Sequence, residues 1–308
     1  MQFPEFLQRR DQRPSRQAQA VTIGNFDGVH RGHQALLQSL VQSEMPTAVL
    51  TFEPLPREFF RPLEAPPRLS SLREKIIALR GFGISQIYCL PFDLALARLS
   101  AEDFITQILV DRLRCRLLVV GHDFRFGAAR RGDLDMLQHF GRKHNFQVVE
   151  QPAYMIENQR VSSTGIRQCL QAGNLHQASS WLGRPYTLCG KIIHGDHLGR
   201  ELGFPTANIP LHRRRVPVQG IFAGRLRSTQ GTWMAAISIG LRPTVDGKKM
   251  VLEAHCLDAG DPNLYGQRVA VELHHKLRDE EKYSDLDTLK TAIAHDVENT
   301  RQYFNEHP

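Results

Sequence analysis

Short apolar runs alternate with helical patterns along the first half of the chain, between residues 20 and 153. Runs with the length and composition of strands cover residues 20–26, 47–52, 86–92, 116–124 and 147–153. Helical periodicity fits residues 33–43, 71–82, 101–113 and 133–145, and Ser100 with Asp103 predicts the cap and first-turn acid of the third helix. We therefore predict a parallel sheet covered on both faces, with ligands beyond the carboxyl ends of its strands.

The pattern changes after Gly183. Strand-like runs at residues 187–195, 220–227, 232–240, 250–258 and 267–278 are separated by turns rich in Gly, Pro and Asp. They predict a compact antiparallel barrel or sandwich. The chain closes on a predicted helix over residues 284–304, with an apolar stripe formed by Leu286, Leu289, Ile293, Val297 and Tyr303. We expect two domains, residues 1–183 and 184–308.

The composition limits the class of protein and its partners. Of 308 residues, 41% are hydrophobic and 23% charged, which excludes disordered, collagen-like and coiled-coil chains. The net charge of +7 suits an anionic ligand but does not separate nucleic acid from nucleotides or a membrane surface. The cysteines are scattered singly, and we find neither a signal peptide nor an apolar run that could span a membrane. We expect a cytoplasmic protein with no membrane partner.

The first candidate site is the segment GNFDGVHRGH, residues 24–33, which follows the first predicted strand and opens the first helix. Glycines let the backbone approach a ligand closely, and a helix N-terminus offers free N–H groups to an anion. His30 and His33 can turn toward the same anion. The segment is neither a G-x-G-x-x-G fingerprint nor a P-loop, so it predicts another kind of phosphate site. Helix capping or packing is the alternative role for the two histidines.

Two further segments follow later in this half. GHDFRFG, residues 121–127, places Phe124 and Phe126 around an arginine, although two core phenylalanines would give the same pattern. VSSTGIR, residues 161–167, combines three hydroxyls with an arginine at a predicted helix start. That combination suits phosphate oxygens, and it also fits an ordinary helix cap. Together the three segments indicate a nucleotide site.

His-x-Gly-His after the first strand, with SST-x-x-R near the domain end, resembles the HxGH nucleotidyltransferase superfamily. The segments GNFDGVHRGH, TFEPLPREFF, GHDFRFG and VSSTGIR are similar to the FAD synthetase domain of the bacterial bifunctional riboflavin kinase/FAD synthetase family. The resemblance implies a Rossmann-like domain that transfers AMP from ATP to FMN, giving FAD and pyrophosphate. Leu55 stands where the family usually has histidine, and Gly165 where a larger residue is common.

The resemblance also implies roles for these residues. His30 and His33 would bind ATP phosphates and stabilise charge in the transition state, while catalytic Arg167 would hold the leaving phosphates with Ser163 and Thr164. Further nucleotide and flavin contacts would come from Gly24, Asn25, Phe26, Asp27, Gly28, Gly32, Asp123, Phe124, Arg125, Phe126 and Ser162. The FMN phosphate would attack in line without a covalent intermediate, so positioning and electrostatics would carry the rate.

A second candidate site lies in GRELGFPTANI, residues 199–209. Gly199 and Gly203 permit close approach of the backbone to a ligand. Thr206 and Asn208 present oxygens of the kind that Mg²⁺ prefers.

A carboxylate on a later strand could complete this site. Glu253 shares a strand face with Val251, His255 and Leu257 by two-residue alternation. Among apolar neighbours a carboxyl can have a raised pKa and serve as a base. The alternative is a surface glutamate on an edge strand.

The segments CGKIIHGDHLGRELGFPTANI, GIFAGRL, SIGLRPT, LEAHCLD and NLYGQRV are similar to the riboflavin kinase domain of the same family. The resemblance implies an antiparallel β-barrel closed by the C-terminal helix, which moves the ATP γ-phosphate to the ribityl hydroxyl of riboflavin. Glu253 would be the base, and Thr206 and Asn208 would bind Mg²⁺ with the nucleotide. Ser238 and Leu241 replace the usual Asn and Thr of this family. The phosphate flap and its surroundings would comprise Gly195, Gly199, Arg200, Gly203, Phe204 and Pro205.

The resemblance covers residues 18–304 and makes riboflavin, FMN and ATP the partners of a monomer or weak homo-oligomer, with no nucleic acid. One alternative is an HxGH enzyme for another phosphorylated acceptor, such as a pantetheine or nicotinamide nucleotide. Another is a nucleic-acid-binding protein, given the arginine clusters at Arg9, Arg10, Arg13 and Arg16 and at residues 213–215. These clusters lack aromatic residues for base stacking, and we assign the N-terminal arm no function.

Overall fold

The computed structural model describes residues 7–8, 15, 17–195, 202–211, 215–244, 247–258 and 264–307. Backbone contacts divide the chain into an N-terminal unit, Met1–Pro66 with Ser70–Ser162, and a C-terminal unit, Pro67–Leu69 with Ser163–Pro308. The predicted domain boundary after residue 183 falls inside the C-terminal unit so defined, and it stays a prediction.

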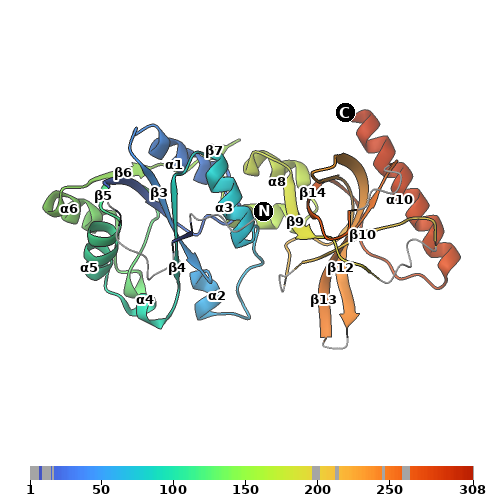
Figure 1. Cartoon of the computed structure of the whole chain (residues 1–308), viewed down its shortest axis with the longest axis horizontal. Helices are drawn as coiled ribbons and strands as arrows, with labels where there is room; N and C mark the ends of the chain where they lie inside the picture. The colour runs from blue at the N-terminus through green and yellow to red at the C-terminus, as the bar shows by residue number, and fades with distance from the viewer. Residues whose placement is uncertain are drawn as a thin grey trace. The chain divides into compact units, whose positions relative to one another are not determined.

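The N-terminal unit is built on a six-stranded sheet in which every pairing is parallel (Figure 1). Its order is β1-β4-β3-β2-β5-β6. The strands are β1 (Leu7–Gln8), β2 (Gln19–Ile23), β3 (Thr47–Glu53), β4 (Gln86–Pro91), β5 (Cys115–Gly121) and β6 (Gln147–Gln151). The parallel sheet expected from the apolar runs is confirmed.

Helices connect these strands. They are α1 (Arg31–Val41), α2 (Pro56–Phe60), α3 (Leu72–Gly81), α4 (Leu94–Arg98), α5 (Ala101–Asp103), η1 (Phe104–Arg112), η2 (Ala128–Arg130) and α6 (Leu134–His144). A short hairpin of β7 (Met155–Ile156) and β8 (Gln159–Arg160) follows the sheet.

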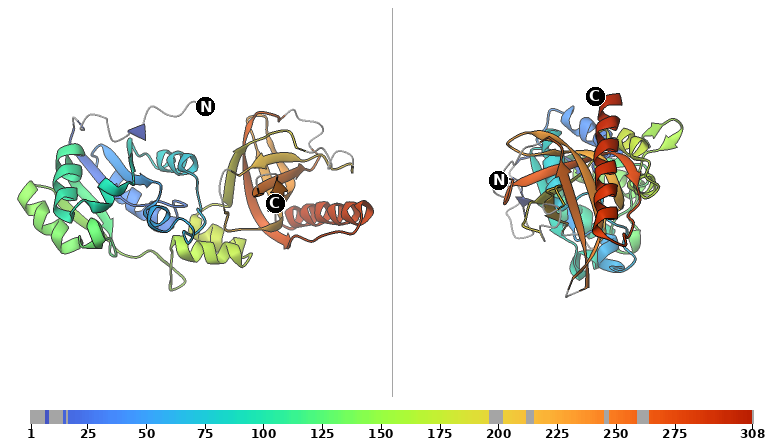
Figure 2. Two further views of the ribbon diagram at one scale, coloured as in Figure 1. Left: turned by 90° about the horizontal axis from the view of Figure 1, so that it is seen from below. Right: turned by 90° about the vertical axis from the view of Figure 1, so that its right-hand side faces the viewer.

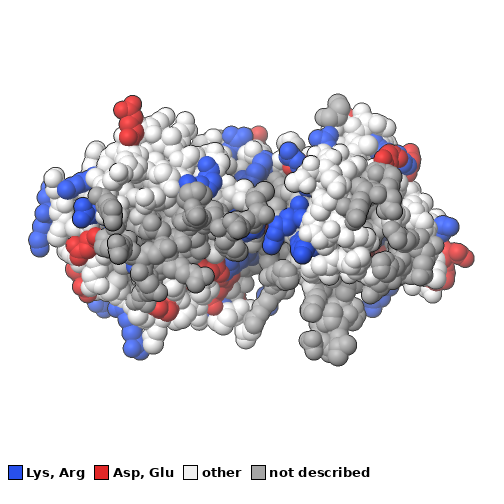
Figure 3. Space-filling view, in the orientation of Figure 1, with Lys and Arg blue, Asp and Glu red and all other residues white. Residues whose placement is uncertain are grey.

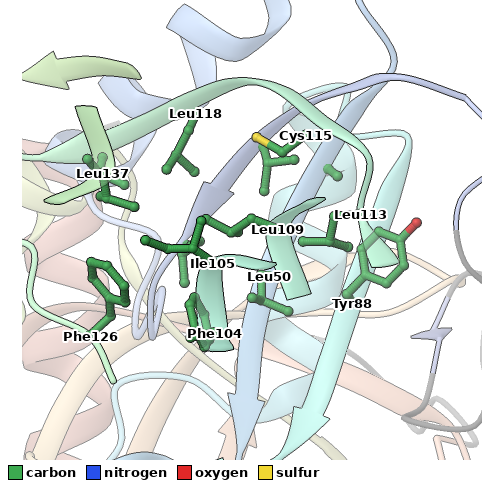
Figure 4. Packing of buried hydrophobic residues seen from close by; sticks show 14 of the residues in the cluster. Leu50, Tyr88, Phe104, Ile105, Leu109, Leu113, Cys115, Leu118, Phe126 and Leu137 are labelled. Atoms are coloured by element: carbon green, nitrogen blue, oxygen red, sulfur yellow. The ribbon is translucent and has the colours of Figure 1, made fainter. Parts of the chain in front are cut away.

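Two apolar clusters lie on opposite faces of this sheet, because successive strand residues point to opposite sides. On β3, Leu50 packs in the cluster that contains Ile105 and Leu109 of η1 (Figure 4). The neighbouring Val49 packs in the cluster that contains Leu79 of α3. Helices therefore cover both faces, as predicted.

The third predicted helix departs from ideal α geometry. It begins at the predicted cap, where Ser100 Oγ accepts a hydrogen bond from the Asp103 N–H at 2.9 Å. Beyond Phe104 the hydrogen bonds reach five residues back, as from the Leu113 N–H to the Ile108 carbonyl at 2.9 Å. This π-helix was not predicted, because apolar periodicity does not separate it from an α-helix over nine residues.

The C-terminal unit is an antiparallel barrel in the order β10-β13-β12-β11-β14-β9. Its strands are β9 (Tyr186–Lys191), β10 (Ala207–Pro210), β11 (Gly220–Arg227), β12 (Thr232–Thr244), β13 (Gly247–Cys256) and β14 (Arg268–Arg278). A bridge between Ile193 and Asn208 links the segment after β9 to β10, so the sheet nearly closes. The predicted barrel is confirmed.

Among the described residues, the helices of this unit are α7 (Ser163–Gln171), α8 (Leu175–Leu182) and α10 (Leu286–Glu306). Helix α10 lies along the barrel, against β11, β12 and β14 (Figures 1 and 2). Within the described residues, none of the helices has the length and apolar composition needed to cross a membrane.

The predicted stripe of α10 was partly wrong. Val297 is buried as expected, but Leu286 is 56% exposed, whereas Asp296 and Phe304 are buried. The helix turns this face inward because Arg278 of β14 forms a two-pronged ion pair with Asp296, at 2.9 and 2.6 Å. An ion pair therefore replaces part of the apolar contact that the pattern predicted.

Candidate functional site

The loop between β2 and α1 carries the first set of candidate residues. Phe26 (φ 48°), Gly28 (φ 85°) and Val29 (φ 44°) occupy the left-handed backbone region, which only glycine enters without strain. Phe26 and Val29 are fully buried in the cluster with Leu79, and this burial offsets the strain. The turn ends β2 at Ile23, so the strand predicted to reach residue 26 was too long.

Asp27 anchors this loop from within. It is 2% exposed, and its Oδ1 accepts hydrogen bonds from the Ser70 N–H at 2.9 Å and the Ser70 hydroxyl at 3.3 Å. The Ser70 Oγ in turn accepts a hydrogen bond from the Gly28 N–H at 3.0 Å. A buried carboxylate is tolerated when it is hydrogen-bonded in this way, so Asp27 fixes the loop to the start of α3.

The two histidines are stacked on each other. His30 caps α1 because its Nδ1 accepts the His33 N–H at 3.3 Å, and the ring centroids lie 3.6 Å apart. Burial, then the charges of His30 and Lys75, lower the pKa of His33 well below its usual value. The capping role left open by the sequence is therefore real for His30, and it also brings both imidazoles to the start of the helix.

Two glycines of the motif make room for rings. A Cβ on Gly24 would lie 3.1 Å from the Phe26 ring, and one on Gly32 would lie 3.2 Å from the His30 ring. Both contacts are tighter than a side chain normally makes, so small residues at these positions let the loop close on itself.

Lys75 is a residue of this region that sequence reasoning missed. It is 1% exposed on α3, and its Nζ donates a hydrogen bond to Thr51 Oγ1 at 3.2 Å. That hydroxyl lies 3.4 Å from the carbonyl of Asn25, in the motif loop. The available signal was the position of Lys75 in the helical stripe of Leu72 and Leu79.

The aromatic pair of GHDFRFG belongs largely to the core. Phe126 is 6% exposed and packs against Phe104, with ring centroids 5.5 Å apart (Figure 4). Phe124 is half-buried and stacks on Phe126 at 5.6 Å. Strand β5 ends at Gly121, earlier than predicted, because residues 122–124 form a turn. The core interpretation describes Phe126 better than a ligand-facing one.

A second aromatic group, also missed from the sequence, lies at the carboxyl ends of β3 and β4. Phe52, Phe59, Phe60 and Phe92 pack edge to face with ring centroids 5.3–5.7 Å apart. Phe60 is 62% exposed. In the sequence, the adjacent phenylalanines of TFEPLPREFF could have indicated this aromatic group. Exposed aromatic side chains at this edge of a parallel sheet offer a flat apolar surface to a ligand.

The two charged residues of GHDFRFG are already paired. Arg125 Nη1 lies 3.1 Å from Asp133 Oδ2, and Asp123 pairs with Arg160 of β8. Burial acts to raise the pKa of Asp123, but the hydrogen bond and charge of Arg160 lower it overall. A ligand would have to share or displace these exposed pairs.

The SSTGIR segment opens α7, as predicted. Ser162 is the last residue of the N-terminal unit, while Ser163, Thr164 and Arg167 belong to the C-terminal unit. Arg167 donates from Nε to the Pro67 carbonyl at 2.6 Å. Hydroxyls and backbone N–H groups at a helix start are suited to phosphate oxygens.

Gly165 owes its identity to packing. A Cβ at this position would lie 2.3 Å from the ring of Trp181 on α8. The indole of Trp181 therefore leaves no room for a side chain at position 165.

In the C-terminal unit, strand register brings the second set of residues together. Glu253 on β13 pairs with Asn208 of β10 on one side and with Ser238 of β12 on the other. Directly opposite residues of antiparallel strands project from the same face. Glu253 is half-buried on an interior strand, so the edge-strand alternative was wrong. Leu257 lies past the end of β13 and does not continue this face.

His255 connects the same face to the loop before β10. Its Nδ1 lies 2.9 Å from the Pro205 carbonyl, and its ring meets that of Phe204 edge to face at 5.4 Å. A carbonyl only accepts, so Nδ1 carries the proton in this contact. His255 thereby holds the backbone that leads directly into Thr206.

One hydrogen bond within this segment orients the amide of Asn208. Asn208 Nδ2 donates to the Thr206 carbonyl at 3.4 Å, which directs the other amide atom, Oδ1, elsewhere. A Cβ on Gly195 would lie 2.4 Å from Asn208 Nδ2, so a side chain at this position would displace the amide. Gly203 adopts φ 87°. Gly199 and Arg200 of the predicted flap lie outside the described residues.

Among described residues, no group of three or more His, Cys, Asp or Glu side chains is arranged to hold a metal ion. A Mg²⁺ site on Thr206 and Asn208 would therefore need oxygens from a bound nucleotide, as is usual for this ion.

On one face of the molecule, the coloured charged residues are dispersed (Figure 3). Lys and Arg form several separate groups on the face drawn in Figure 3, with Asp and Glu near some of them. Arg9, Arg10, Arg13 and Arg16 of the N-terminal arm lie outside the described residues, as do residues 213–214.

Comparison with protein families identifies both halves. The family model described as FAD synthetase matches residues 12–165, and the model described as riboflavin kinase matches residues 182–304. The first match contains the HxGH loop, and the second contains Asn208 and Glu253.

Curated relatives match nearly the whole chain. "Bifunctional riboflavin kinase/FMN adenylyltransferase" of Escherichia coli (strain K12) is 44% identical over 92% of both chains. The protein of the same name from Pseudomonas fluorescens is 46% identical over 92% of this chain and 93% of its own. That from Haemophilus influenzae is 43% identical over 93% of this chain and 94% of its own.

A solved structure shares the fold of both units. "Crystal Structure of Macrolide-efflux Protein from Streptococcus pneumoniae" matches with a TM-score of 0.82 and 27% identity, covering 96% of this chain and 99% of that one. With both domain models matched in order and relatives of this identity along nearly the full length, the chain belongs to the family of bifunctional riboflavin kinase/FMN adenylyltransferases.

Proposed function

We propose that this chain phosphorylates riboflavin to FMN with ATP and then transfers AMP from a second ATP to FMN, giving FAD and pyrophosphate. The observation that carries the proposal is the register of the barrel, which sets Glu253 between Asn208 and Ser238 on one face. A carboxylate beside an amide and a hydroxyl is the chemistry that a metal-assisted phosphoryl transfer needs.

In the kinase reaction, the ribityl hydroxyl of riboflavin attacks the γ-phosphorus of ATP. The bond to the β-γ bridging oxygen breaks, ADP leaves, and Glu253 accepts the hydroxyl proton. Thr206 and Asn208 would hold Mg²⁺ with the nucleotide phosphates, and the bound ion would neutralise charge on them. The hydrogen bond from Asn208 Nδ2 to the Thr206 carbonyl supports this assignment, because it leaves the amide oxygen for a cation.

In the adenylyl-transfer reaction, a phosphate oxygen of FMN attacks the α-phosphorus of ATP and pyrophosphate leaves. His30 and His33, at the start of α1, would donate to the phosphates of ATP. The role of Ser163, Thr164 and Arg167 in holding the β- and γ-phosphates is proposed from the resemblance of their motif alone. The fixed geometry of the loop supports this role, because Asp27 and the buried Phe26 hold it before substrate arrives. The isoalloxazine ring would pack on Phe60 and Phe92 rather than on Phe126.

The cellular compartment, the oligomeric state and the partners are proposed from the cysteines and from the two motif sets. All five cysteines are free thiols, which supports a reducing compartment such as the cytoplasm. Both motif sets lie in one chain, so we propose that a monomer is complete and that any weak homo-oligomer is not needed for either reaction. The substrates are small molecules, and the proposal requires neither nucleic acid nor membrane.

Chromatography tests the proposal directly. The protein is incubated with riboflavin, ATP and Mg²⁺, and FMN followed by FAD is expected. Supplying 4′-phosphopantetheine or nicotinamide mononucleotide in place of FMN should give no adenylylated product. Transfer to one of these acceptors in preference to FMN would replace the second half of the proposal.

Two variants separate the reactions. Glu253→Gln should lower FMN formation by about 10²-fold or more and leave the conversion of FMN to FAD unchanged. His33→Ala should lower FAD formation by about 10²-fold and spare FMN formation. Equal loss of both activities in either variant would contradict the two-site assignment.

A further inference from the structure

Lys75 is a charged side chain in a place where lysines rarely lie. It is 1% exposed, and it ranks among the largest fully buried side chains of the chain. Lysine is almost never fully buried unless it is paired, because an ammonium group loses its hydration there. Its neighbours Ile76 and Leu79 on α3 already supply the apolar contacts of the helix. Packing alone therefore does not account for the ammonium group.

The ammonium group is directed at the HxGH loop through one intermediate. Lys75 Nζ donates to Thr51 Oγ1 at 3.2 Å, and Thr51 is fully buried on β3. The Thr51 hydroxyl can then donate its own hydrogen to the Asn25 carbonyl, 3.4 Å away. A short chain of hydrogen bonds thus runs from α3 through the sheet to the second residue of the motif.

Lys75 also acts on the histidine pair through its charge. Burial, His30 and Lys75, in that order, lower the pKa of His33. The charged groups that act on His33 in this way are therefore His30 from the loop and Lys75 from α3. A fixed cation near this imidazole also adds positive potential where anionic phosphates are expected.

We infer that Lys75 is a positioning residue of the adenylyl-transfer site, which holds the loop at Asn25 through Thr51 and supplies a fixed positive charge near His33. The inference rests on the proposed function of that site. Lys75 does not need to touch substrate in this role, since it acts through the residues that do.

The test uses Lys75→Met in the full-length chain, because methionine keeps most of the apolar stem and removes the ammonium group. We expect kcat/KM for FMN adenylylation to fall about 100-fold, the size of loss that an ångström-scale misplacement can cause. Riboflavin phosphorylation by the same molecule should be unchanged, so it serves as an internal control for folding. Lys143→Met, which removes an exposed lysine of the same unit, should change neither activity.

Stability separates this role from a structural one. Because the buried ammonium group is costly, the melting temperature of Lys75→Met should stay the same or rise while adenylylation falls. A lower melting temperature together with a parallel loss of both activities would overturn the inference. So would a variant with wild-type adenylylation.

The pH profile gives a readout that packing would not move. Removing the Lys75 charge should raise the pKa of His33, so the limb of the adenylylation profile that belongs to His33 should move to higher pH, whichever protonation state is active. Thr51→Val should lower adenylylation too, and combining it with Lys75→Met should give less than the product of the two losses. The route through Thr51 and His33 would be excluded if Lys75→Met left the pH profile of adenylylation unchanged and the loss in the double variant equalled the product of the two single losses. If the wild-type protein fails to convert FMN to FAD, the proposed function fails and not this inference alone.

Discussion

The two proposed sites of this chain are built in opposite ways. The adenylyl-transfer loop is assembled from residues close in sequence and is held by buried groups, among them Phe26, Asp27 and His30. The kinase site is assembled from strands far apart in sequence, and its main side chains, Asn208 and Glu253, are half-buried on a sheet face. The first depends on local anchoring, whereas the second depends on register.

This difference predicts how each site responds to damage. Removing a buried hydrogen-bond acceptor such as Asp27 leaves its donors unsatisfied, so loss of such an anchor, unlike Lys75→Met, should affect stability and activity together. Side chains on a half-exposed barrel face can be changed with little effect on folding, so kinase variants should lose activity alone. Each prediction below tests one side of this contrast.

The largest effect is expected for Asp27→Ala. The substitution leaves the Ser70 N–H and the Ser70 hydroxyl without their buried acceptor and releases the turn at Gly28. We expect the free energy of unfolding of the N-terminal unit to fall by about 3 kcal/mol and the rate of adenylylation to fall by about 100-fold or more. Hydrogen exchange of the N-terminal unit and FAD formation measure the two effects.

Ser70→Ala is the matched control for this change. It removes the hydroxyl but keeps the Ser70 N–H bond to Asp27, so a loss of about 1 kcal/mol is expected. If Asp27→Ala and Ser70→Ala destabilise equally, the carboxylate is not the anchor. Kinase activity should survive in both variants.

The next effect should come from Asp296→Ala in the C-terminal unit. Removing the buried carboxylate leaves Arg278, 23% exposed, without its two-pronged partner, at a cost of about 3 kcal/mol. Urea denaturation followed by tryptophan fluorescence measures it, because both tryptophans, Trp181 and Trp233, lie in this unit. Such a loss would mean that the C-terminal unit is stabilised mainly at α10 and not at the residues of the proposed kinase site.

The exposed ion pair of Arg301 with Asp258 supplies the comparison on the same helix. Its side chains are 41% and 66% exposed, so Arg301→Ala should cost less than about 1 kcal/mol. A loss as large as that of Asp296→Ala would show that α10 is held by its surface charges.

Features that depend on residues close in sequence could be predicted, and features that depend on contacts between distant residues could not. Alternation of apolar runs predicted the parallel sheet and the barrel, and the helix starts at Ser100 and Ser163 were recognisable because caps are read over three or four residues. The pairing of Asn208 with Glu253 could not be predicted, because register is fixed by contacts between distant strands.

Buried charges were the features that sequence reasoning missed. Asp296 looks like a surface residue of an amphipathic helix, and Lys75 lies on the apolar stripe of its helix but is a residue type that is normally exposed. Their tertiary partners, Arg278 and Thr51, show that both are inside. The same limit applied to Phe126, where an exposed and a buried aromatic ring give one pattern. Gly165 was noted as unusual, but its cause, the Trp181 ring, comes from the next helix.

A smaller effect is expected for His255→Leu. The change removes the proton donor to the Pro205 carbonyl and frees the backbone that carries Thr206. We expect KM for Mg-ATP to rise and kcat of the kinase to fall, together about 10-fold in kcat/KM, with FAD formation from FMN unchanged. Steady-state kinetics with FMN and riboflavin as separate substrates measure this split.

His255→Asn is the variant that sharpens the result. An asparagine amide can replace the Nδ1 donor, so it should restore most of the kinase activity lost in His255→Leu. Failure of this rescue, with a lowered melting temperature in both variants, would mean that His255 serves packing against Phe204 instead.

The smallest effect, and the subtlest difference between the units, is in the response to acid. Because the folded-state pKa of His33 lies below its ordinary value of 6.5, the unfolded chain binds a proton first as the pH falls below that value. The N-terminal unit should therefore lose stability as the pH falls below about 6.5.

In the C-terminal unit, the contact with His274 and the ion pair with Arg227 lower the pKa of Glu272 below its ordinary value of 4.5. Burial acts to raise this pKa, but its effect is smaller than theirs. The stability that Glu272 contributes is present above pH 4.5 and should be lost only below it. Between pH 7 and 5, the hydrogen-exchange protection of β2–β5 peptides, corrected for the slower intrinsic exchange at lower pH, should decrease, while tryptophan-detected stability changes less. His33→Leu should flatten the response of the N-terminal unit. If both units of the wild-type chain lose stability equally in acid, and His33→Leu does not change this, then His33 does not make the first site separately sensitive to pH.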